Sequence, residues 1–282
     1  NYCSSKFNPG SEIEDPIVNN RSEKYTVDSF GELSRTARLR LLKMHYTAGV
    51  GHIGGNLSAL DTLLFLHHLV MCPDDIFILS KGHAAGALYC TLWTVGVLSD
   101  EDLETFHGED SRLSGHPPIN SIPEIRVATG SLGHGLSIAS GISLARKLKG
   151  TRGRVFCLCS DGEWQEGSNW EALIFSRHHD LTNLVLLVDV NGLQGYGRTS
   201  EVGSMTSLNR YFEIFGMDVV ELDGHSFESL EGLFLSPEGG RMVYLLNTIK
   251  GKGVSFMEDK LEWHYLPLSD DLYAKAVREQ EV

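Results

Sequence analysis

Four short runs of apolar residues in the second half of the chain constrain its fold more than any other feature. They are VFCLCS (155–160), NLVLLVDV (183–190), MDVVEL (217–222) and MVYLLNTI (242–249). The stretches with helical spacing between them lie near 167–179, 206–215 and 226–235. Strands that are apolar throughout are typical of a parallel sheet covered on both faces, and the intervening helices provide right-handed crossovers. The sequence therefore predicts an α/β fold: a doubly wound, mostly parallel sheet with helices on both faces.

The first half of the chain is expected to be mainly helical. From Asp28 to Met44, apolar residues recur at three- and four-residue spacing, and Gly49 marks a stop. The further elements expected here are an apolar helix over 57–71, a buried strand over 76–79, a helix over 84–95 and a helix capped by Ser99.

The domain organisation follows from the same pattern. No repeat or linker divides residues 28–267, which are expected to form one α/β domain. Residues 1–27 are polar and are predicted to form an N-terminal arm, whereas residues 268–282 are predicted to form a helical tail. The chain has no initiator Met, which leads us to expect a trimmed or processed product.

Charge and composition exclude several classes of protein. The 282 residues carry a formal net charge of −13, whereas binding to nucleic acid or to an anionic membrane needs a basic face. A local phosphate pocket remains compatible with this charge. No run approaches the ~18 apolar residues of a membrane span, and the N-terminal residues do not resemble a signal peptide.

The five cysteines are an odd number without the spacing of a zinc site. Cys157 and Cys159 alternate within one run, so we expect them on the same face of a buried strand. Free thiols of this kind fit a reducing compartment, and we expect a cytoplasmic protein.

Polar residues follow three of the predicted strands at their carboxyl ends. Asp161-Gly162, Asn191-Gly192 and Lys250-Gly251 would meet at one edge of a parallel sheet, where such sheets bind ligands. Mg²⁺ takes oxygen ligands, and Asp161, Asn191 and the backbone carbonyl of Leu193 are candidates. Glycines and helix N-termini let backbone N–H groups approach a phosphate. The pattern favours a metal–phosphate site.

Each of these motifs has a simpler interpretation when it is read alone. Asp-Gly and Asn-Gly are common turn dipeptides. The segment GSLGHG (130–135) is not the dinucleotide fingerprint, which requires GxGxxG after a strand. Histidines are plentiful, at 12, and those in helical stretches are expected to be packing or surface residues: His67, His68, His178 and His179.

Six blocks taken together resemble one family. SDGEWQEGSNWEA followed by NLVLLVDVNGLQ resembles the thiamin diphosphate motif. The other blocks, LSKGHAAGALY, SGHPP, ATGSLGHGLSIA, DGHS and KGKGVSFMEDKLEWH, are similar in content and order to the N-terminal third of transketolases. The resemblance covers residues 30 to 267 and implies the domain that holds the diphosphate and the Mg²⁺ of thiamin diphosphate, with Ca²⁺ or Mn²⁺ as substitutes.

The resemblance also implies roles for individual residues. The metal ligands would be Asp161, Asn191 and the carbonyl of Leu193. The cofactor would be bound by His83, Gly130, Ser131, Leu132, Gly162, Glu163, Asn191 and Lys250, with Glu163 supporting the site rather than taking part in the reaction. The catalytic group would be His52, His83, His116, His264 and Glu166. Glu166 would bridge to the catalytic glutamate of a partner across a subunit interface.

The chain departs from the family pattern at three positions and in its length. Ser160 replaces a glycine, Gly55 stands where some relatives carry serine, and His134 stands where many carry glutamine. Nothing after Leu268 would provide the pyrimidine-binding or C-terminal domains. The resemblance thus implies one subunit of a split transketolase, inactive alone, which pairs with a second chain as an α2β2 heterotetramer. Helices 57–71 and 167–177 are candidate interface elements.

The implied activity is transfer of a two-carbon ketol unit from a ketose phosphate to an aldose or aldehyde. The alternatives are the α subunit of a thiamin-dependent 2-oxoacid dehydrogenase and a non-catalytic transketolase-like interaction protein. A 1-deoxyxylulose-phosphate synthase fits less well because it is one long chain, and a plain phosphate-binding Rossmann protein leaves most of the motifs unexplained. The identities of the donor and acceptor would depend on the missing half.

Overall fold

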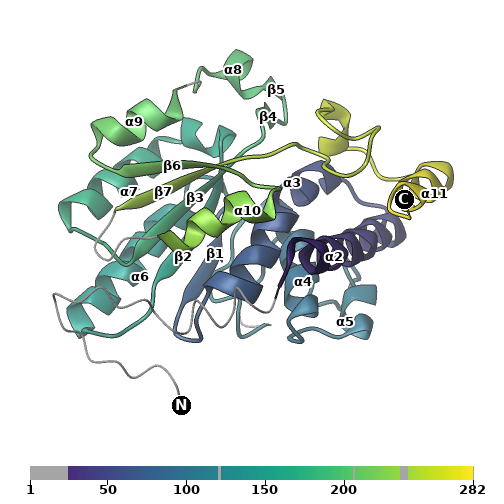
Figure 1. The fold of residues 1–282 in the computed structure, drawn as a ribbon, viewed down its shortest axis with the longest axis horizontal. Helices are drawn as coiled ribbons and strands as arrows, with labels where there is room; N and C mark the ends of the chain where they lie inside the picture. Colours follow the sequence, from purple (N-terminus) through teal and green to yellow (C-terminus); the bar gives the residue numbers. More distant parts are fainter. Residues whose placement is uncertain (1–24, 120–121, 206, 236–240, 282) are drawn as a thin grey trace.

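A five-stranded parallel sheet forms the centre of the molecule. The computed structural model describes residues 25–119, 122–205, 207–235 and 241–281. The strands, in their order across the sheet, are β1 (Ile76–Leu79), β2 (Val155–Ser160), β3 (Leu184–Val190), β7 (Met242–Asn247) and β6 (Asp218–Asp223), and every neighbouring pair is parallel (Figure 1). The predicted fold class is confirmed.

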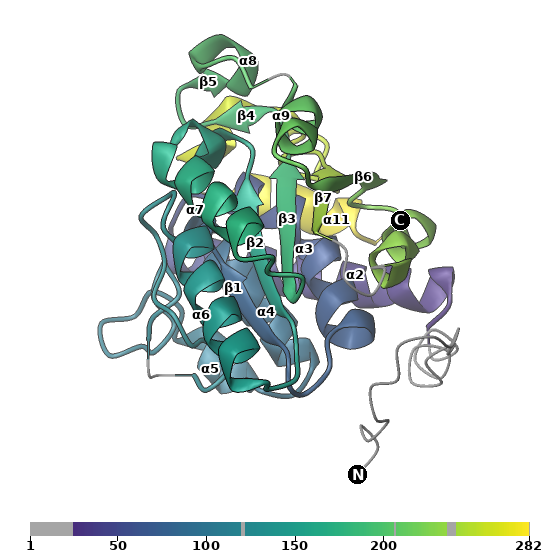
Figure 2. The same ribbon diagram turned by 90° about the vertical axis from the view of Figure 1, so that its left-hand side faces the viewer.

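The two faces of the sheet are both covered because successive strand residues point to opposite sides. Phe77 and Leu79 of β1 belong to a core shared with α2 (Val27–Ala48), α3 (Ile53–Phe65) and α4 (Ala85–Thr94). Ile76 and Ile78 belong to a second core. That core is shared with α6 (Gly135–Lys149), α7 (Gly167–His178) and α9 (Leu208–Ile214). Figure 2 shows α6 and α7 on one side of the sheet and α3 on the other.

The boundaries of α2 follow from local chemistry. Thr26 and Ser29 form a reciprocal capping box at its start. The helix ends at Gly49, whose φ of 64° is a left-handed conformation that glycine adopts more readily than residues with a Cβ atom. The predicted strand face of Cys157 and Cys159 is also confirmed, because both side chains are fully buried in the second core.

The second helix differs from its prediction in extent and in role. The α-helical part begins at Ile53 and ends at Phe65, and a π-helical turn continues it over Leu66–Val70. Leu57, Leu60 and Leu63 have no exposed surface within this single chain. The prediction of an interface on this helix is therefore wrong for α3, because its apolar residues already fill the chain's own core.

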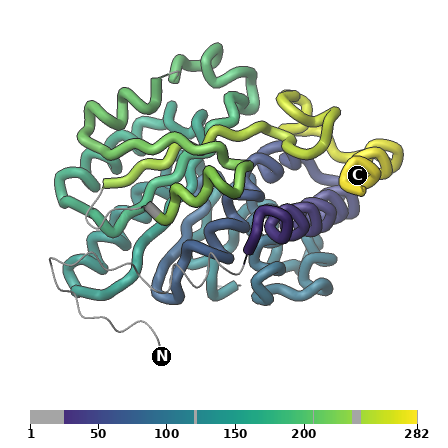
Figure 3. The backbone as a smooth tube through the Cα atoms, viewed as in Figure 1, coloured from purple at the N-terminus to yellow at the C-terminus, as the bar shows by residue number. Residues whose placement is uncertain are grey.

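The C-terminal segment packs on the domain. Helix α11 (Asp270–Glu279) is capped by Ser269 and lies beside α2, as the yellow and purple segments in Figure 3 show. The rings of Tyr46 and Tyr273 stack with centroids 4.2 Å apart, and the Tyr46 hydroxyl donates to Asp270 over 3.0 Å. The Gln280 side-chain amide donates to the carbonyl of Gly253 and so attaches the tail to the loop after β7.

Shorter elements complete the fold. They are α5 (Asp100–Glu104), the antiparallel pair β4 (Leu193–Gln194) and β5 (Gly197–Arg198), α8 (Thr199–Val202), and α10 (Phe227–Leu230) with a 3-10 turn over Glu231–Leu235. The β4–β5 pair was not predicted. The predicted arm lies, apart from residues 25–27, outside the described residues. Among the described helices, none has the length and apolar character needed to cross a membrane.

Candidate functional site

The carboxyl ends of four parallel strands bring chemically active side chains to one edge of the sheet. Lys81 follows β1, Asp161 follows β2, Asn191 follows β3 and Lys250 follows β7. In Figure 2 the arrowhead of β3 points toward the β4–β5 pair and α8, which lie beyond this edge. The edge is where open parallel sheets bind ligands.

Asp161 is connected to the segment after β3. Its Oδ1 accepts from the backbone N–H of Gly162 over 2.8 Å, and its Oδ2 accepts from the backbone N–H of Gly192 over 2.8 Å. The Thr199 hydroxyl donates to Oδ2 over 3.1 Å. Burial raises the pKa of Asp161, and the charge of Asp189 adds to the shift. A cation beside this carboxylate would reverse both effects.

The other two predicted metal ligands lie next to Asp161 in the fold. The Asn191 side-chain oxygen accepts from the backbone N–H of Leu193 over 3.1 Å. The carbonyl of Leu193 accepts from the ammonium group of Lys250 over 3.2 Å. The structure thus brings Asp161, the 191–193 turn and Lys250 together, with a positive group already held against the Leu193 oxygen.

A buried ion pair lies beneath this edge and was missed in the sequence. The ammonium group of Lys81 pairs with Asp189, whose carboxylate also accepts from the hydroxyls of Ser58 and Thr248. Burial raises the pKa of Asp189, but the Lys81 charge and these hydrogen bonds outweigh it, so the pKa is lowered. A single acid inside the otherwise apolar β3 was the available signal, because a buried carboxylate needs a partner.

Four histidines predicted for the site come together from four separate segments. The ring centroids of His52 and His83 are 5.0 Å apart, those of His52 and His264 are 5.1 Å apart, and those of His83 and His116 are 4.6 Å apart. His52 precedes α3, His83 lies in the 3-10 turn Gly82–Ala84, and His264 ends the 3-10 turn Leu261–His264.

Three of these histidines, His52, His83 and His264, are held in the neutral state. Burial lowers the pKa of His83 to about 4 and that of His264 to about 3, and nearby ionisable groups add to both shifts. Burial also lowers the pKa of His52. Neutral imidazole has one donor and one acceptor nitrogen, so each ring can exchange a proton with a hydroxyl group near neutral pH.

The glycine-rich segment after residue 129 passes close to the histidines. A Cβ atom on Gly130, whose φ is 143°, would lie 2.8 Å from Cδ2 of His116. A Cβ atom on Gly82 would lie 2.7 Å from the backbone N of Gly130. Glycine is therefore needed at both positions for the two segments to approach each other. Within this segment, Ser131 is exposed and Leu132 is half-buried.

Glu163 holds segments of the site together through its buried carboxylate. Its carboxylate accepts from the backbone N–H groups of Gly133 over 2.9 Å and Ser160 over 3.1 Å, and from the Ser80 hydroxyl. Both oxygens are therefore engaged with protein groups, which tie together β1, β2 and the glycine-rich segment. The family resemblance places Glu163 beside the cofactor in a supporting role, and its bonds fit support better than direct contact.

Glu166 lies apart from this cluster. It precedes α7, and its side chain is exposed. A Cβ atom on Gly133 would lie 2.6 Å from the Cβ of Glu166. Its side chain is thus at the surface beside the glycine-rich segment.

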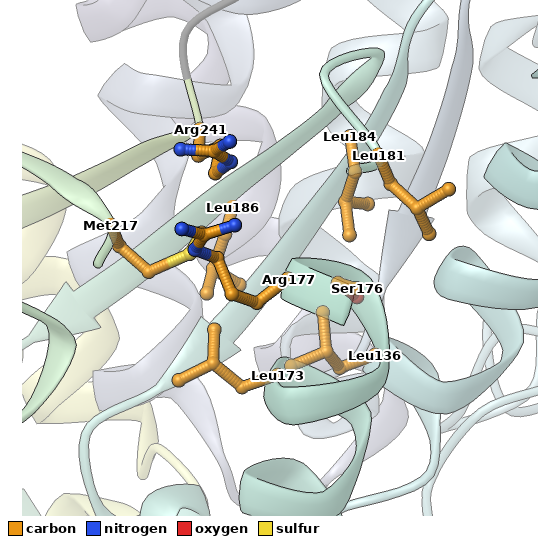
Figure 4. Close-up of a pocket in the computed structure, with 9 residues that line it drawn as sticks. All are labelled: Leu136, Leu173, Ser176, Arg177, Leu181, Leu184, Leu186, Met217 and Arg241. Atoms are coloured by element: carbon orange, nitrogen blue, oxygen red, sulfur yellow. The ribbon is translucent and has the colours of Figure 1, made fainter. Parts of the chain in front are cut away.

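Two cavities elsewhere contain none of the predicted site residues. One, drawn in Figure 4, is lined mainly by leucines with Arg177 and Arg241 at its side, and its volume of about 10 Å³ leaves room for no more than a water molecule. A cavity of about 210 Å³ lies between α2 and α5, with Arg40, Lys43 and Phe106 in its lining.

A parallel α/β domain with a carboxylate, an amide and an ammonium group at its carboxyl edge has the groups that suit a phosphorylated cofactor and a metal ion. The family model described as "Transketolase, thiamine diphosphate binding domain" matches residues 34–280. The chain therefore belongs to the transketolase family, in its thiamin diphosphate-binding part.

Individual relatives agree with this assignment. One of the subunits of apulose-4-phosphate transketolase from Actinobacillus succinogenes is 36% identical over 261 residues, which cover 86% of this chain and 94% of the relative. The protein of the same name from Phocaeicola vulgatus is 41% identical over 258 residues, covering 87% and 92%. The crystal structure of transketolase from Campylobacter jejuni matches with a TM-score of 0.84 and 28% identity, covering 91% of this chain but only 43% of that one.

Proposed function

We propose that this chain is the N-terminal subunit of a two-chain transketolase. It would transfer a two-carbon ketol unit from a ketose phosphate donor to an aldose or aldehyde acceptor. The observation that carries the proposal is the convergence of the Asp161–Asn191 edge with four histidines at the carboxyl end of one parallel sheet. No observation favours a 2-oxoacid dehydrogenase or a non-catalytic protein.

The site fits the diphosphate of thiamin diphosphate. Gly82 and Gly130 let the turn before α4, the glycine-rich segment and His116 approach one another where side chains would collide. Two buried polar atoms beside these glycines and Gly162, Oγ1 of Thr129 and Nε2 of Gln194, have no hydrogen-bond partner among the described residues. Buried polar atoms are rarely left unpaired, so a bound polar group is a suitable partner for them.

The same edge fits Mg²⁺. Asp161, the side-chain oxygen of Asn191 and the carbonyl of Leu193 offer oxygen ligands from one turn and one strand end. Ca²⁺ or Mn²⁺ would substitute for it. Gly162, Ser131, Leu132 and Lys250 would hold the diphosphate. When it is bound, the cofactor stabilises the carbanion that forms as the carbon–carbon bond breaks.

The residues of this chain would bind the sugar and move its protons. Because the Lys250 ammonium is only a donor, Nδ1 of His264 accepts from it over 2.8 Å, and neutral His264 carries its proton on Nε2. His264 thus presents a donor, while His52, His83 and His116 supply further exchangeable sites for the hydroxyls near the reacting carbonyl. Lys250 would balance the negative charge of the diphosphate.

A second chain would complete the enzyme. The chain spans 43% of the Campylobacter jejuni transketolase, and two relatives that it covers almost fully are each named as one of the subunits of a transketolase. Exposed apolar side chains on α6 and α7 support an interface there: Ile138 is 37% exposed, Ile174 is 51% exposed and Phe175 is 39% exposed. Glu166 lies at the start of α7, beside this surface. An α2β2 assembly in the cytoplasm is the arrangement we propose.

The test is reconstitution of this chain with a candidate pyrimidine-binding chain. Ketose phosphate donors are assayed against aldehyde acceptors, with pyruvate decarboxylation measured in parallel. Asp161→Ala should abolish turnover and the binding of thiamin diphosphate with Mg²⁺ measured by calorimetry, whereas the exposed Asp110→Ala should leave both unchanged. Pyruvate decarboxylation without ketol transfer would instead support the 2-oxoacid dehydrogenase. Binding of the partner chain without binding of the cofactor would support the non-catalytic protein.

A further inference from the structure

The side-chain amide of Asn56 lies behind the histidine cluster with nearly all of its hydrogen-bonding capacity in use. Asn56 is in the first turn of α3 and is 1% exposed. Its Nδ2 donates to the backbone carbonyls of His52, over 2.8 Å, and His83, over 3.0 Å. Its Oδ1 accepts from the backbone N–H of Ala87 over 2.7 Å, near the start of α4, where helical N–H groups lack partners.

The two carbonyls belong to residues from different segments whose rings meet in the site. His52 has φ of 65°, an unfavourable conformation for a residue other than glycine, and it directly precedes α3. His83 lies in the turn before α4. The Asn56 amide bonds both backbones at once, so it connects the direction of one Cα–Cβ bond to that of the other.

No other side chain reproduces these three bonds in the same space. A Cβ atom on Gly86 would lie 3.1 Å from Oδ1 of Asn56 and 2.6 Å from Cε1 of His45, so the amide is enclosed. The His45 ring behind it has its Nδ1 3.1 Å from the carbonyl of Leu41 and its Nε2 3.5 Å from Nδ2 of Asn56. Aspartate has the same shape but would direct a carboxylate oxygen at two carbonyl oxygens.

We propose that Asn56 is a positioning residue that fixes the separation and orientation of the His52 and His83 rings through their backbones. Its effect on the reaction rests on the proposed function, whereas its effect on the rings does not. A purely structural role would alter stability and leave the rings in place. The two roles are separable because the NMR resonances of each histidine ring depend on the surroundings of that ring, whereas stability is measured separately by unfolding.

The experiment compares Asn56→Asp and Asn56→Ser with the control Asn183→Asp. Asn183 also bonds through both ends of its amide, to the carbonyl and hydroxyl of Ser143, but it lies before β3 at the opposite end of the sheet. Asn56→Ser replaces the amide by a single uncharged hydroxyl, and it serves as the second variant should Asn56→Asp fail to fold. Full chains labelled with ¹³C and ¹⁵N at histidine are examined by NMR, and thermal unfolding is measured for each.

Both Asn56 variants should shift the ring resonances of His52 and His83 and leave those of His67 and His225 in place. In the reconstituted enzyme, kcat should fall by about 10- to 100-fold, because misplacement of reacting groups by an ångström has effects of that size. Asn183→Asp should lower thermal stability with neither effect. Unchanged His52 and His83 resonances in a folded Asn56 variant would overturn the proposal. Shifted resonances with unchanged kcat would support the positioning role and instead contradict the catalytic roles proposed for the two histidines.

Discussion

The ammonium group of Lys250, in the loop after β7, lies 2.8 Å from Nδ1 of His264, in the 3-10 turn Leu261–His264. Burial lowers the pKa of Lys250 to about 8, with the Lys81 charge adding to the shift, so the group still carries its proton at pH 7. Burial and the charge of Lys250 lower the pKa of His264 to about 3. Lys250 therefore sets the tautomer of His264 and, together with burial, keeps its ring neutral.

Replacing Lys250 by methionine should free Nδ1 of His264 and raise the pKa of that histidine, because a nearby positive charge is removed. The ¹⁵N shifts of the His264 ring, followed against pH, measure both effects. Lys252→Met, which changes a partly exposed lysine two residues away, is the control and should leave the ring unaffected. An unaltered His264 titration in Lys250→Met would contradict the coupling.

The stability of the protein should fall as the pH is lowered from 6.5 to 4. Burial lowers the pKa of His45 and of His67 to about 4; the His45 side chain is buried and that of His67 is half-buried. Between the folded pKa and the unfolded value near 6.5, the unfolded chain binds more protons, so stability increases with pH. Each histidine contributes a slope of up to about 1.4 kcal/mol per pH unit in this window and none above it.

Urea unfolding at several pH values measures this slope. His67→Gln should reduce it between pH 4 and 6.5 and leave the difference between pH 7 and 8 unchanged. The exposed His178→Gln should not alter the slope at all. A slope that stays the same in His67→Gln would mean that His67 is not held neutral.

The Lys81–Asp189 pair should be costly to break from one side only. Both side chains are buried, at 7% and 1% exposed, so Asp189→Ala leaves an uncompensated ammonium group and should lower the free energy of unfolding by about 3–5 kcal/mol. The double variant Lys81→Met with Asp189→Leu should recover much of that loss. Chemical denaturation provides the measurement.

An exposed pair is the matched control for that measurement. Arg198 and Asp259 are 2.8 Å apart with 50% and 53% of their side chains exposed. Asp259→Ala should change stability far less than Asp189→Ala, because surface ion pairs contribute little. Equal effects at Asp189 and Asp259 would show that the buried pair is not the stabilising feature described here.

The apolar surface on α7 should matter for assembly and not for folding. Ile174→Asp and Phe175→Asp should lower the apparent mass in solution, measured by sedimentation with and without the partner chain, and leave thermal unfolding of the single chain nearly unchanged. Ile214→Asp on α9, which is 79% exposed, is the comparison on another surface. Assembly that is insensitive to both α7 variants but lost in Ile214→Asp would place the interface elsewhere.

The regular elements and their order could be predicted from the amino-acid sequence alone. Apolar runs separated by helical stretches predicted the parallel sheet, Gly49 predicted the end of α2, and Asp161 and Asn191 were predicted to lie at one edge. These features depend on periodicity and on neighbours close in the chain, which local physical chemistry controls. The family resemblance supplied the histidines, whose roles in the reaction are still predictions.

Which buried polar groups meet became visible only in the three-dimensional fold. Lys81 reaches Asp189 across 108 positions, and Asn56 joins His52, one helical turn away, to His83, which lies 27 positions further along the chain. The fold also showed that the apolar helix α3 fills the core instead of an interface. Such pairings depend on strand register and on how helices pack over the sheet, and these follow from the summed burial of many side chains rather than from any local pattern.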